Sequence, residues 1–348
     1  KILVKVDNKI ITNYDLIREI RTLLLINNIE LNNDNYNKTK AIALNGLIGR
    51  YLKLSEIEKY EIEKFNKDCA EEIRIQGSNH DLKQKSIEWL QEANNHKYSY
   101  HFKWMNRPII QYPQDIQMMQ ELIMEVKPDL IIETGIAHGG SILLSASMLA
   151  LLDLSDSVLN NENYDISKTN RKVLALDIDI REHNKKEILN NPFSKYIEML
   201  EGSSTSEEIV NKVHNIASNY NNILIFLDSN HTHDHVLAEL NAYAELTSVG
   251  SYIVAFDTVI DYLPENHLPN ESNPSMSEAR TYTKGNSPMS AVREFLKDNE
   301  NFKIISEIDS KLLISVAPNK PIILAPKNEA RCIAPLSLAN TNLASRII

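Results

Sequence analysis

Acidic residues close five apolar segments of this 348-residue chain, and they are the first sign of a chemical site. In chain order these acids are Glu133, Asp177, Glu201, Asp228 and Asp257. Because the carboxyl ends of parallel strands meet at one edge of a sheet, we expect these side chains to lie together. Clustered carboxylates repel one another unless a cation or hydrogen-bond donors lie between them, so the pattern predicts a ligand or metal site.

A glycine cluster follows the first of these acids. Three of the nine glycines, Gly135, Gly139 and Gly140, fall within six positions, which indicates backbone freedom or close approach of a ligand. Read as G-x-A-x-x-G, the loop is a degenerate dinucleotide fingerprint whose ribose-binding acid is displaced to Asp177. The alternative is an adenosyl ligand with a sulfonium and an amino-acid group, for which Glu133 would face the ammonium and Asp177 the ribose. A purely structural helix-entry turn is the third interpretation.

Three of the ten histidines, His231, His233 and His235, follow the fourth acid. Zinc is disfavoured because alternate residues do not share a helix face and no cysteine is near. Asp228 and His231 are therefore placed at the rim of the site, where a neutral imidazole is a suitable base for a hydroxyl proton. His233 and His235 are expected to be partly solvated.

Alternating strands and helices must position these residues. From residue 113 onwards, apolar strands alternate with helices, which predicts an α/β fold with a Rossmann-like, doubly wound, mostly parallel sheet. Two strands at 302–306 and 312–316 are expected to form an antiparallel hairpin at one edge. The predicted divisions are a helical N-terminal extension over residues 1–63, a main domain over 64–318 and a C-terminal tail over 319–348.

The composition excludes several classes of protein. With 47 acidic and 37 basic side chains the formal charge is −10, which argues against nucleic acid as a partner. The two cysteines, Cys69 and Cys332, form no disulfide framework. The sequence has neither a leader-like apolar segment nor an apolar run of about 18 residues, so no transmembrane segment is expected. A cytoplasmic protein is predicted, with a place at a membrane surface left open.

Several long motifs, in order, resemble one known family, the cephalosporin hydroxylase/rhamnosyl O-methyltransferase family, over residues about 65–318. They are KWMNRPIIQYPQDIQ, KPDLIIETGIAHGGSILLSASML, VLALDIDIREHN, EGSSTSEEIV and LDSNHTHDHVLAELNAYAELTSVGSYIVAFDT. The resemblance implies the class I S-adenosylmethionine methyltransferase fold. It also implies these cofactor contacts: Gly135, Gly139, Gly140 and Ser141 at the methionine end, Asp177 at the ribose, and Gly202, Ser203 and Ser204 at the adenine.

The resemblance also bears on a metal. In metal-dependent O-methyltransferases, acids at the ends of strands four and five hold a magnesium ion that binds the acceptor hydroxyl, and here these acids are Asp228 and Asp257. The family commonly has a Glu-Asp pair at strand five, whereas this chain has Phe256 before Asp257. Magnesium is therefore left open, and His231 is the candidate base in its absence.

The function implied by the resemblance is O-methylation of a hydroxyl on a sugar, a glycolipid or a secondary metabolite. A non-catalytic cofactor-binding partner of another enzyme and an NAD-dependent oxidoreductase are kept as alternatives. Trp104, Arg107 and Gln111 are candidates to cover the cofactor or line the acceptor site, with a core role as the alternative for the tryptophan. The stretch 258–287 has the length of a substrate lid.

The first 60 residues resemble, less specifically, the N-terminal region of SurA-type periplasmic chaperones, through the phrase KILVKVDNKIITNYDLIREIRTLLL. The other interpretation is a helical extension that packs on the main domain or mediates oligomerisation. A homo-oligomer is left open.

Overall fold

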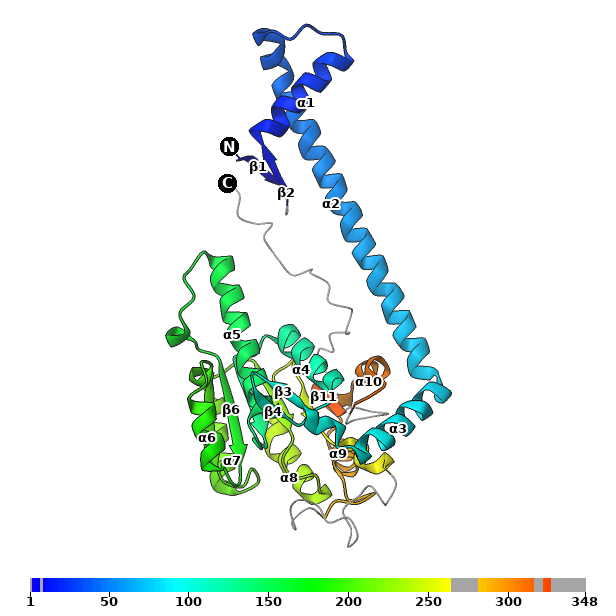
Figure 1. Cartoon of the computed structure of the whole chain (residues 1–348), viewed down its shortest axis with the longest axis vertical. Helices are drawn as coiled ribbons and strands as arrows, with labels where there is room; N and C mark the ends of the chain where they lie inside the picture. The colour runs from blue at the N-terminus through cyan, green and yellow to red at the C-terminus, as the bar shows by residue number, and fades with distance from the viewer. Residues whose placement is uncertain (1, 7–8, 264–280, 316–321, 327–348) are drawn as a thin grey trace. The chain divides into compact units, whose positions relative to one another are not determined.

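The largest sheet of the computed structural model, which describes residues 2–6, 9–263, 281–315 and 322–326, has seven strands of mixed direction (Figure 1). The sheet order is β10-β11-β9-β8-β5-β6-β7. The strands are β5 (Leu130–Thr134), β6 (Lys172–Asp177), β7 (Ile197–Glu201), β8 (Ile223–Leu227), β9 (Ile253–Ala255), β10 (Phe302–Ile304) and β11 (Ile322–Pro326). The five strands from β9 to β7 are parallel, and β11 and β10 are antiparallel. The predicted Rossmann-like, doubly wound sheet is confirmed.

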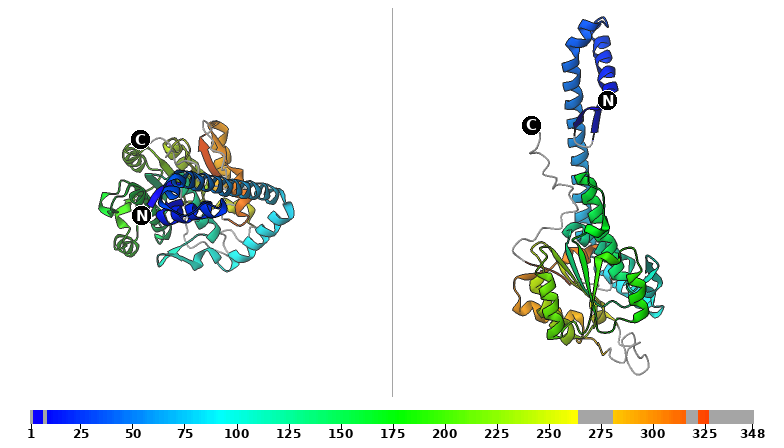
Figure 2. Two further views of the ribbon diagram at one scale, coloured as in Figure 1. Left: turned by 90° about the horizontal axis from the view of Figure 1, so that it is seen from above. Right: turned by 90° about the vertical axis from the view of Figure 1, so that its left-hand side faces the viewer.

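Helices cover both faces of this sheet, as the right-hand view of Figure 2 shows. Successive residues of a strand point to opposite faces, so Ile131 packs on one helical layer and Leu130 and Ile132 on the other. The first layer contains α4 (Pro113–Val126), α5 (Gly140–Asn160) and α6 (Glu182–Leu189). The second contains α7 (Glu207–Ala217), α8 (His233–Tyr243) and α9 (Pro288–Asp298). Apolar side chains on both faces explain why the strands read as continuous hydrophobic runs.

The antiparallel edge differs from its prediction. The segment expected to be the second strand of a hairpin, 312–316, begins at the last residue of helix α10 (Ser306–Leu312). Ile305 and Ile308 are both buried, and Leu312 packs beside them at helical spacing. The partner of β10 is instead β11, which also pairs with β9. The predicted tail over 319–348 therefore contains a strand of the sheet.

The described residues divide into two compact units. Those up to Glu71 belong to the first unit, and those from Glu72 onwards belong to the second. The first unit contains β1 (Ile2–Val6), β2 (Lys9–Thr12), α1 (Asn13–Ile26) and most of α2 (Asn33–Ser78). The predicted division between residues 63 and 64 falls inside α2, because no proline or glycine follows Gly49 until Gly77 and the helix continues.

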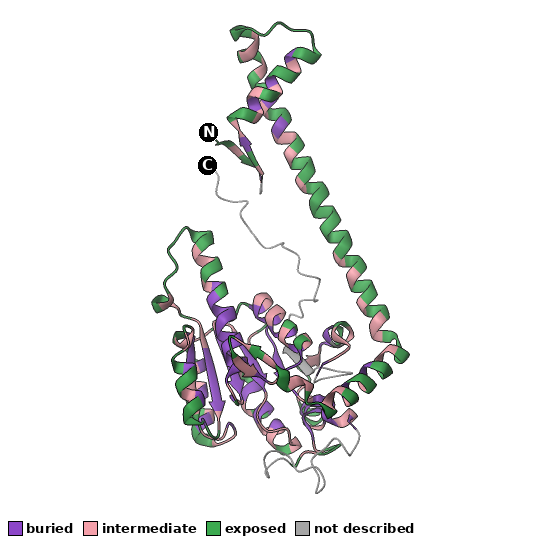
Figure 3. Ribbon diagram, in the orientation of Figure 1, coloured by how far each residue is buried: buried purple, intermediate pink, exposed green. Residues whose placement is uncertain are grey.

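Helix α1 begins at a capping box in which the Thr12 hydroxyl accepts the Asp15 N–H and the Asp15 carboxylate accepts the Thr12 N–H. Its inner face buries Leu16, Ile20 and Leu24 in a small core with Ala43 and Leu47 of α2. The middle of α2 has no such cover among the described residues, and its exposed turns are green in Figure 3. The helices of the predicted N-terminal extension are present, and the strands β1 and β2 precede them.

The second unit begins with the end of α2 and continues through α3 (His80–Asn95), the single turn η1 (Tyr98–His101), β3 (Phe102–Trp104) and β4 (Arg107–Ile109). Helix α5 alone among the described helices is long and apolar enough to cross a membrane, but over half of its most apolar stretch is buried in the core. The expected lid at 258–287 begins with the turn η5 (Thr258–Tyr262), and its central residues 264–280 lie outside the described residues.

Candidate functional site

Asp228, His231 and Asp257 lie together at the carboxyl ends of β8 and β9. One ligand atom from each falls within 4.8 Å of the others, and all three side chains are half-buried. His231 Nδ1 lies 3.0 Å from Asp257 Oδ2. In the part of the chain that the structure describes, this is the one group of three or more such residues close enough to hold a metal ion.

Gln111 joins this cluster from the segment before α4. Its Nε2 donates to Asp228 Oδ2 at 2.9 Å, and the residue is only 2% exposed. Its Oε1 is buried and has no hydrogen-bond partner among the described residues. The two carboxylates therefore each face a donor group, Gln111 for Asp228 and His231 for Asp257. Sequence reasoning named Gln111 as a lining residue but not as the partner of Asp228.

Phe256 occupies the position at which the family commonly has a glutamate. Its ring is buried and packs on Phe226, with ring centroids 6.0 Å apart, so it belongs to the core of the sheet. Asp257 follows in a left-handed conformation with φ +55°. Tyr112 lies under the cluster, and burial together with the negative charge of Asp257 raises the pKa of its hydroxyl to about 12.

The glycine loop lies directly against Asp228. A Cβ on Gly135 would lie 2.1 Å from the Asp228 carbonyl oxygen, and Gly135 has φ +91°. A Cβ on Gly140 would meet the Pro108 carbonyl oxygen at 2.2 Å, and one on Gly139 would meet the Ile188 side chain at 2.7 Å. The loop therefore needs glycine because three neighbouring elements approach its backbone.

Polar side chains hold this loop in place. Asp177 Oδ2 accepts the N–H groups of Ile136 at 2.8 Å and Ala137 at 3.3 Å. Arg107 donates from Nε and Nη2 to the His138 carbonyl oxygen at 2.9 and 2.7 Å. Asn184 adds a bond from its Nδ2 to the Ala137 carbonyl oxygen at 2.8 Å. Asp177 thus lies against the glycine loop, and its contact with a ribose stays a prediction.

Glu133 is buried inside the sheet and not at its rim. It lies two residues after Ile131 and shares its face, so it points at α5, where Ser141 and Ser145 donate to its two oxygens. Burial raises the pKa of this carboxyl to about 7, and the two seryl hydroxyls offset part of that rise. Glu201 at the end of β7 is exposed. The five acids therefore do not gather, and only Asp228 and Asp257 belong to the cluster of Asp228, His231 and Asp257.

The buried carboxyl predicts a pH-dependent stability. Glu133 keeps its proton in the folded protein up to pH about 7 but loses it near its ordinary pKa of 4.5 when unfolded. The unfolded chain therefore binds fewer protons in this window, and stability falls as the pH rises through it, by ~3 kcal/mol from this group. Urea unfolding at pH 4 to 8 is expected to show this decline in the wild type and a smaller one in Glu133→Gln. Parallel curves for the two proteins would contradict the assignment.

The three histidines separate, as their spacing predicted. His233 Nδ1 lies 2.8 Å from the Ser290 hydroxyl of α9, and His235 Nε2 lies 3.1 Å from the Ser204 hydroxyl. Both side chains are about one-fifth exposed, at 20% and 22%. His231 alone reaches the two acids.

The remaining predicted residues lie in two places. Gly202, Ser203 and Ser204 follow β7, where the Ser204 hydroxyl points inward to Glu239 of α8 at 2.6 Å. Trp104 donates from Nε1 to the Ser147 hydroxyl of α5 at 3.0 Å, which is a core contact and favours the structural interpretation of this residue. The sequence analysis did not single out Glu239. The one feature that could have indicated it is an acidic residue among the apolar, buried positions of α8.

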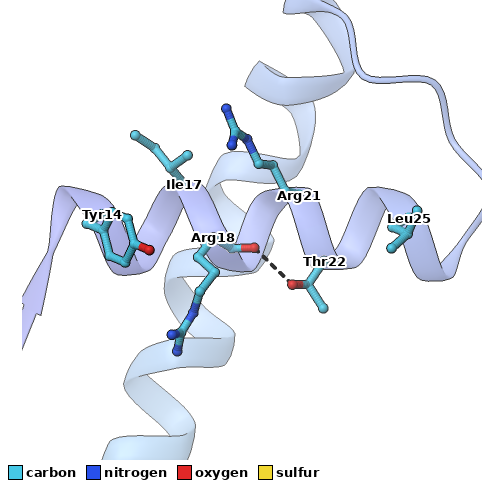
Figure 4. Close-up of a pocket in the computed structure, with 6 residues that line it drawn as sticks. All are labelled: Tyr14, Ile17, Arg18, Arg21, Thr22 and Leu25. Atoms are coloured by element: carbon cyan, nitrogen blue, oxygen red, sulfur yellow. Dashed lines mark hydrogen bonds between the residues drawn. The ribbon is translucent and has the colours of Figure 1, made fainter.

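A surface hollow on the N-terminal unit is unrelated to these residues. Six side chains of α1 line it: Tyr14, Ile17, Arg18, Arg21, Thr22 and Leu25 (Figure 4). All six come from one helix, with the Thr22 hydroxyl bonded to the Arg18 carbonyl oxygen at 3.0 Å. The sites predicted from the sequence all lie in the other unit.

Two curated proteins illustrate what this chain is similar to. The chain is 30% identical over 151 residues to a rhamnosyl O-methyltransferase of Mycobacterium tuberculosis, covering 43% of this chain and 54% of the relative. It is 27% identical over 162 residues to a protein of that name from Mycobacterium leprae, covering 46% and 62%. The chain thus spans about half the length of the curated relatives it matches.

Solved structures are similar only distantly. An O-methyltransferase from Bacillus cereus in complex with SAH is 14% identical with a TM-score of 0.38, covering 64% of this chain and 82% of that one. A CmcI structure with Mg and SAM is 11% identical with a TM-score of 0.41, covering 65% and 77%. With TM-scores this low, these structures carry no argument about the fold or the site of this chain.

The family model named Rhamnosyl O-methyltransferase/CmcI matches residues 96–323, which is well over half of the chain. The match contains the glycine loop, Asp177 and the cluster of Asp228, His231 and Asp257, and it begins later than the expected residue 65. The likeness of the first 60 residues to SurA-type chaperones stays a prediction. The chain belongs to the Rhamnosyl O-methyltransferase/CmcI family.

Proposed function

We propose that this protein transfers a methyl group from S-adenosylmethionine to a hydroxyl of a sugar, a glycolipid or a related secondary metabolite. The observation that carries the proposal is the contact between Gly135 and the backbone of Asp228. Because of this contact, a cofactor held by the glycine loop would lie next to the cluster of Asp228, His231 and Asp257. Membership of the family and the names of its relatives support oxygen as the atom that is methylated.

The chemistry requires one base and a positioned hydroxyl. The acceptor oxygen attacks the methyl carbon, the carbon–sulfur bond breaks with its electrons going to sulfur, and the hydroxyl proton goes to a base. His231 is the base in this proposal, because Asp257 lies 3.0 Å from its Nδ1 and orients the ring, and a neutral imidazole can accept a hydroxyl proton. Asp257 stabilises the imidazolium that forms, in the manner of a catalytic dyad.

A divalent cation fits the same residues. Asp228 and Asp257 would hold it, and the unpartnered oxygen of buried Gln111 lies on an amide already in contact with Asp228. Hard carboxylate and amide oxygens are the ligands that magnesium prefers. When bound, the ion would lower the pKa of the acceptor hydroxyl and orient it. Phe256 leaves the site one acid short of the family pattern, so we expect the ion to bind more weakly here than at a Glu-Asp pair.

Glu133 and Asp177 complete the proposed cofactor site, with Gly139, Gly140, Ser141, Gly202, Ser203 and Ser204. Asp177 already receives two N–H groups of the loop, so its remaining acceptor capacity faces the ribose hydroxyls in this proposal. Glu133 acts on the cofactor ammonium through Ser141, because its own oxygens are buried. The dinucleotide alternative is disfavoured, because β4 lies against the start of α5, where a pyrophosphate binds.

Calorimetric titration tests the proposal. S-adenosylmethionine and S-adenosylhomocysteine are expected to bind, and NAD is not. Transfer of a labelled methyl group is then measured across rhamnosylated glycolipids and simple glycosides. Tight NAD binding without any response to the sulfonium compound would overturn the proposal. Tight cofactor binding with persistent inactivity would favour the non-catalytic partner role.

Removal of residues 1–71 is expected to leave cofactor binding unchanged. These residues form a separate unit with its own small core, and every residue named as a candidate to contact the cofactor lies after residue 103. The measurement is the dissociation constant of S-adenosylhomocysteine for the shortened chain, with its oligomeric state determined by light scattering. A folded shortened chain that fails to bind would show that the division between the two units is misplaced. A cytoplasmic location, a small-molecule or glycan acceptor and a homo-oligomer remain part of the proposal.

A further inference from the structure

A fully buried glutamate lies beneath the two loops of the proposed cofactor site. Glu239 of α8 is 0% exposed. The Ser204 hydroxyl donates to its Oε1 at 2.6 Å, and the Ser229 hydroxyl donates to the same oxygen at 2.7 Å. Its second oxygen, Oε2, is buried without a hydrogen-bond partner among the described residues. One carboxylate oxygen therefore receives two hydroxyl groups from two different loops.

His235 completes this group, one helical turn before Glu239. Its Nε2 lies 3.1 Å from both seryl hydroxyls. Each hydroxyl gives its single hydrogen to Glu239, so His235 Nε2 is the donor in these contacts, and its one hydrogen is shared between the two hydroxyls. His235 Nε2 also lies 3.4 Å from Glu239 Oε1, so the imidazole, the two hydroxyls and the carboxylate form one group. Such a group fixes the hydroxyl orientations as well as their positions.

The two serines belong to opposite sides of the proposed site. Ser204 lies in the loop after β7, at the proposed adenine end, and its carbonyl oxygen accepts a hydrogen bond from Tyr243 of α8. Ser229 directly follows Asp228, the residue that carries the proposed acceptor side. Through these two hydrogen bonds, Glu239 connects the loop that would bind adenosine with the loop that would hold the acceptor.

We propose that Glu239 is a positioning residue that ties the loops after β7 and β8 together through Ser204 and Ser229 and so sets the shape of the cofactor site. This inference rests on the proposed function. Glu239 itself is buried beneath the site and acts on the cofactor only through the two serines.

Because Glu239 Oε2 has no hydrogen-bond partner among the described residues, a glutamine variant can keep both serine contacts whereas a leucine variant cannot. In Glu239→Gln the amide oxygen still accepts both hydroxyls, and the amide nitrogen replaces an oxygen that has no partner. In Glu239→Leu the volume is similar but both hydroxyls lose their acceptor. We expect the glutamine variant to bind S-adenosylhomocysteine within about threefold of the wild type and the leucine variant to bind about tenfold more weakly or worse. Glu245→Ala, an exposed glutamate just beyond α8, serves as the matched control and is expected to bind like the wild type.

Binding is measured by calorimetry well below the thermal midpoint of each variant, with folding checked by circular dichroism. A folded leucine variant that binds like the wild type would overturn the inference and leave the proposed function intact. A wild type that does not bind would overturn both. If the leucine variant does not fold, Ser229→Ala removes one tie and keeps Glu239 bound to Ser204, and it is expected to weaken binding severalfold. Unchanged binding by that variant would equally overturn the inference.

Discussion

Asp257→Asn is expected to lower the rate of methyl transfer by about 100-fold or more and to leave the affinity for S-adenosylhomocysteine unchanged. Asp257 is the partner of His231 Nδ1 and one of the two carboxylates in the cluster, so it serves the acceptor side in either version of the chemistry. Asparagine keeps the shape and removes the charge that stabilises a protonated His231. The loss should therefore appear in turnover and not in cofactor binding.

Addition of a chelator distinguishes a reaction that uses a bound cation from one in which His231 acts as the base without a cation. If a cation acts at the site, chelation lowers the activity of the wild type and has no further effect on Asp257→Asn. The control is Asp234→Asn, an exposed acid in the first turn of α8, which is expected to behave like the wild type. Activity that is indifferent both to chelation and to Asp257→Asn would rule out the carboxylate pair, and His231→Gln would then be the decisive variant.

Gly135→Ala is expected to destabilise the protein by about 3 kcal/mol or more and to abolish cofactor binding. Two costs coincide at this position. The backbone has φ +91°, and the added Cβ would lie 2.1 Å from the Asp228 carbonyl oxygen, so either the loop or the end of β8 must move. Movement of either would separate the glycine loop from the cluster of Asp228, His231 and Asp257.

Gly250→Ala serves as the control, because it measures the loss of stability that comes from a positive φ alone, without a clash of the added Cβ. Gly250 has a similar φ of +79°, but no atom lies within 4 Å of the position its Cβ would occupy. We expect this variant to lose ~1 kcal/mol and to keep cofactor binding. Urea unfolding of both variants measures the difference. If both variants lost the same stability, the loop would be able to move away from the added Cβ. The close contact between Gly135 and Asp228 would then not be required for stability.

The fold was predictable because its signals are local. Each central strand is a short apolar run that ends near an acid or a glycine, and each helix carries its own periodicity, so strand, helix and edge of the sheet follow from neighbouring residues. The hairpin of β1 and β2 has such a signal too, since Asp7 and Asn8 separate two apolar runs in the sequence. The helix α10 was missed because seven residues hold too few apolar positions to distinguish the helical from the strand period.

The site was predictable only in part, because its contacts join distant residues. The positions of Asp228 and Asp257 follow from the parallel sheet, whereas the bond from Gln111 to Asp228 joins residues 117 positions apart and has no local signature. For Glu133, the local pattern suggested a place beside the other acids at the edge of the sheet, but the side chain lies inside. Glu133 ends a strand segment in the sequence, but one further residue, Thr134, still belongs to β5, so the alternation of side chains turns the glutamate inward to α5.

The order of the sheet has a consequence for how the chain is made. β11 lies between β9 and β10, although it is the last described strand to be synthesised. Until residues 322–326 have left the ribosome, β9 has an unpaired edge and β10 has no place in the sheet. Exposed strand edges are sites of mispairing between chains. A nascent chain that stalls or is cleaved before residue 322 therefore carries the proposed site beside an unpaired strand edge, and its solubility depends on whether residues 322–326 are made.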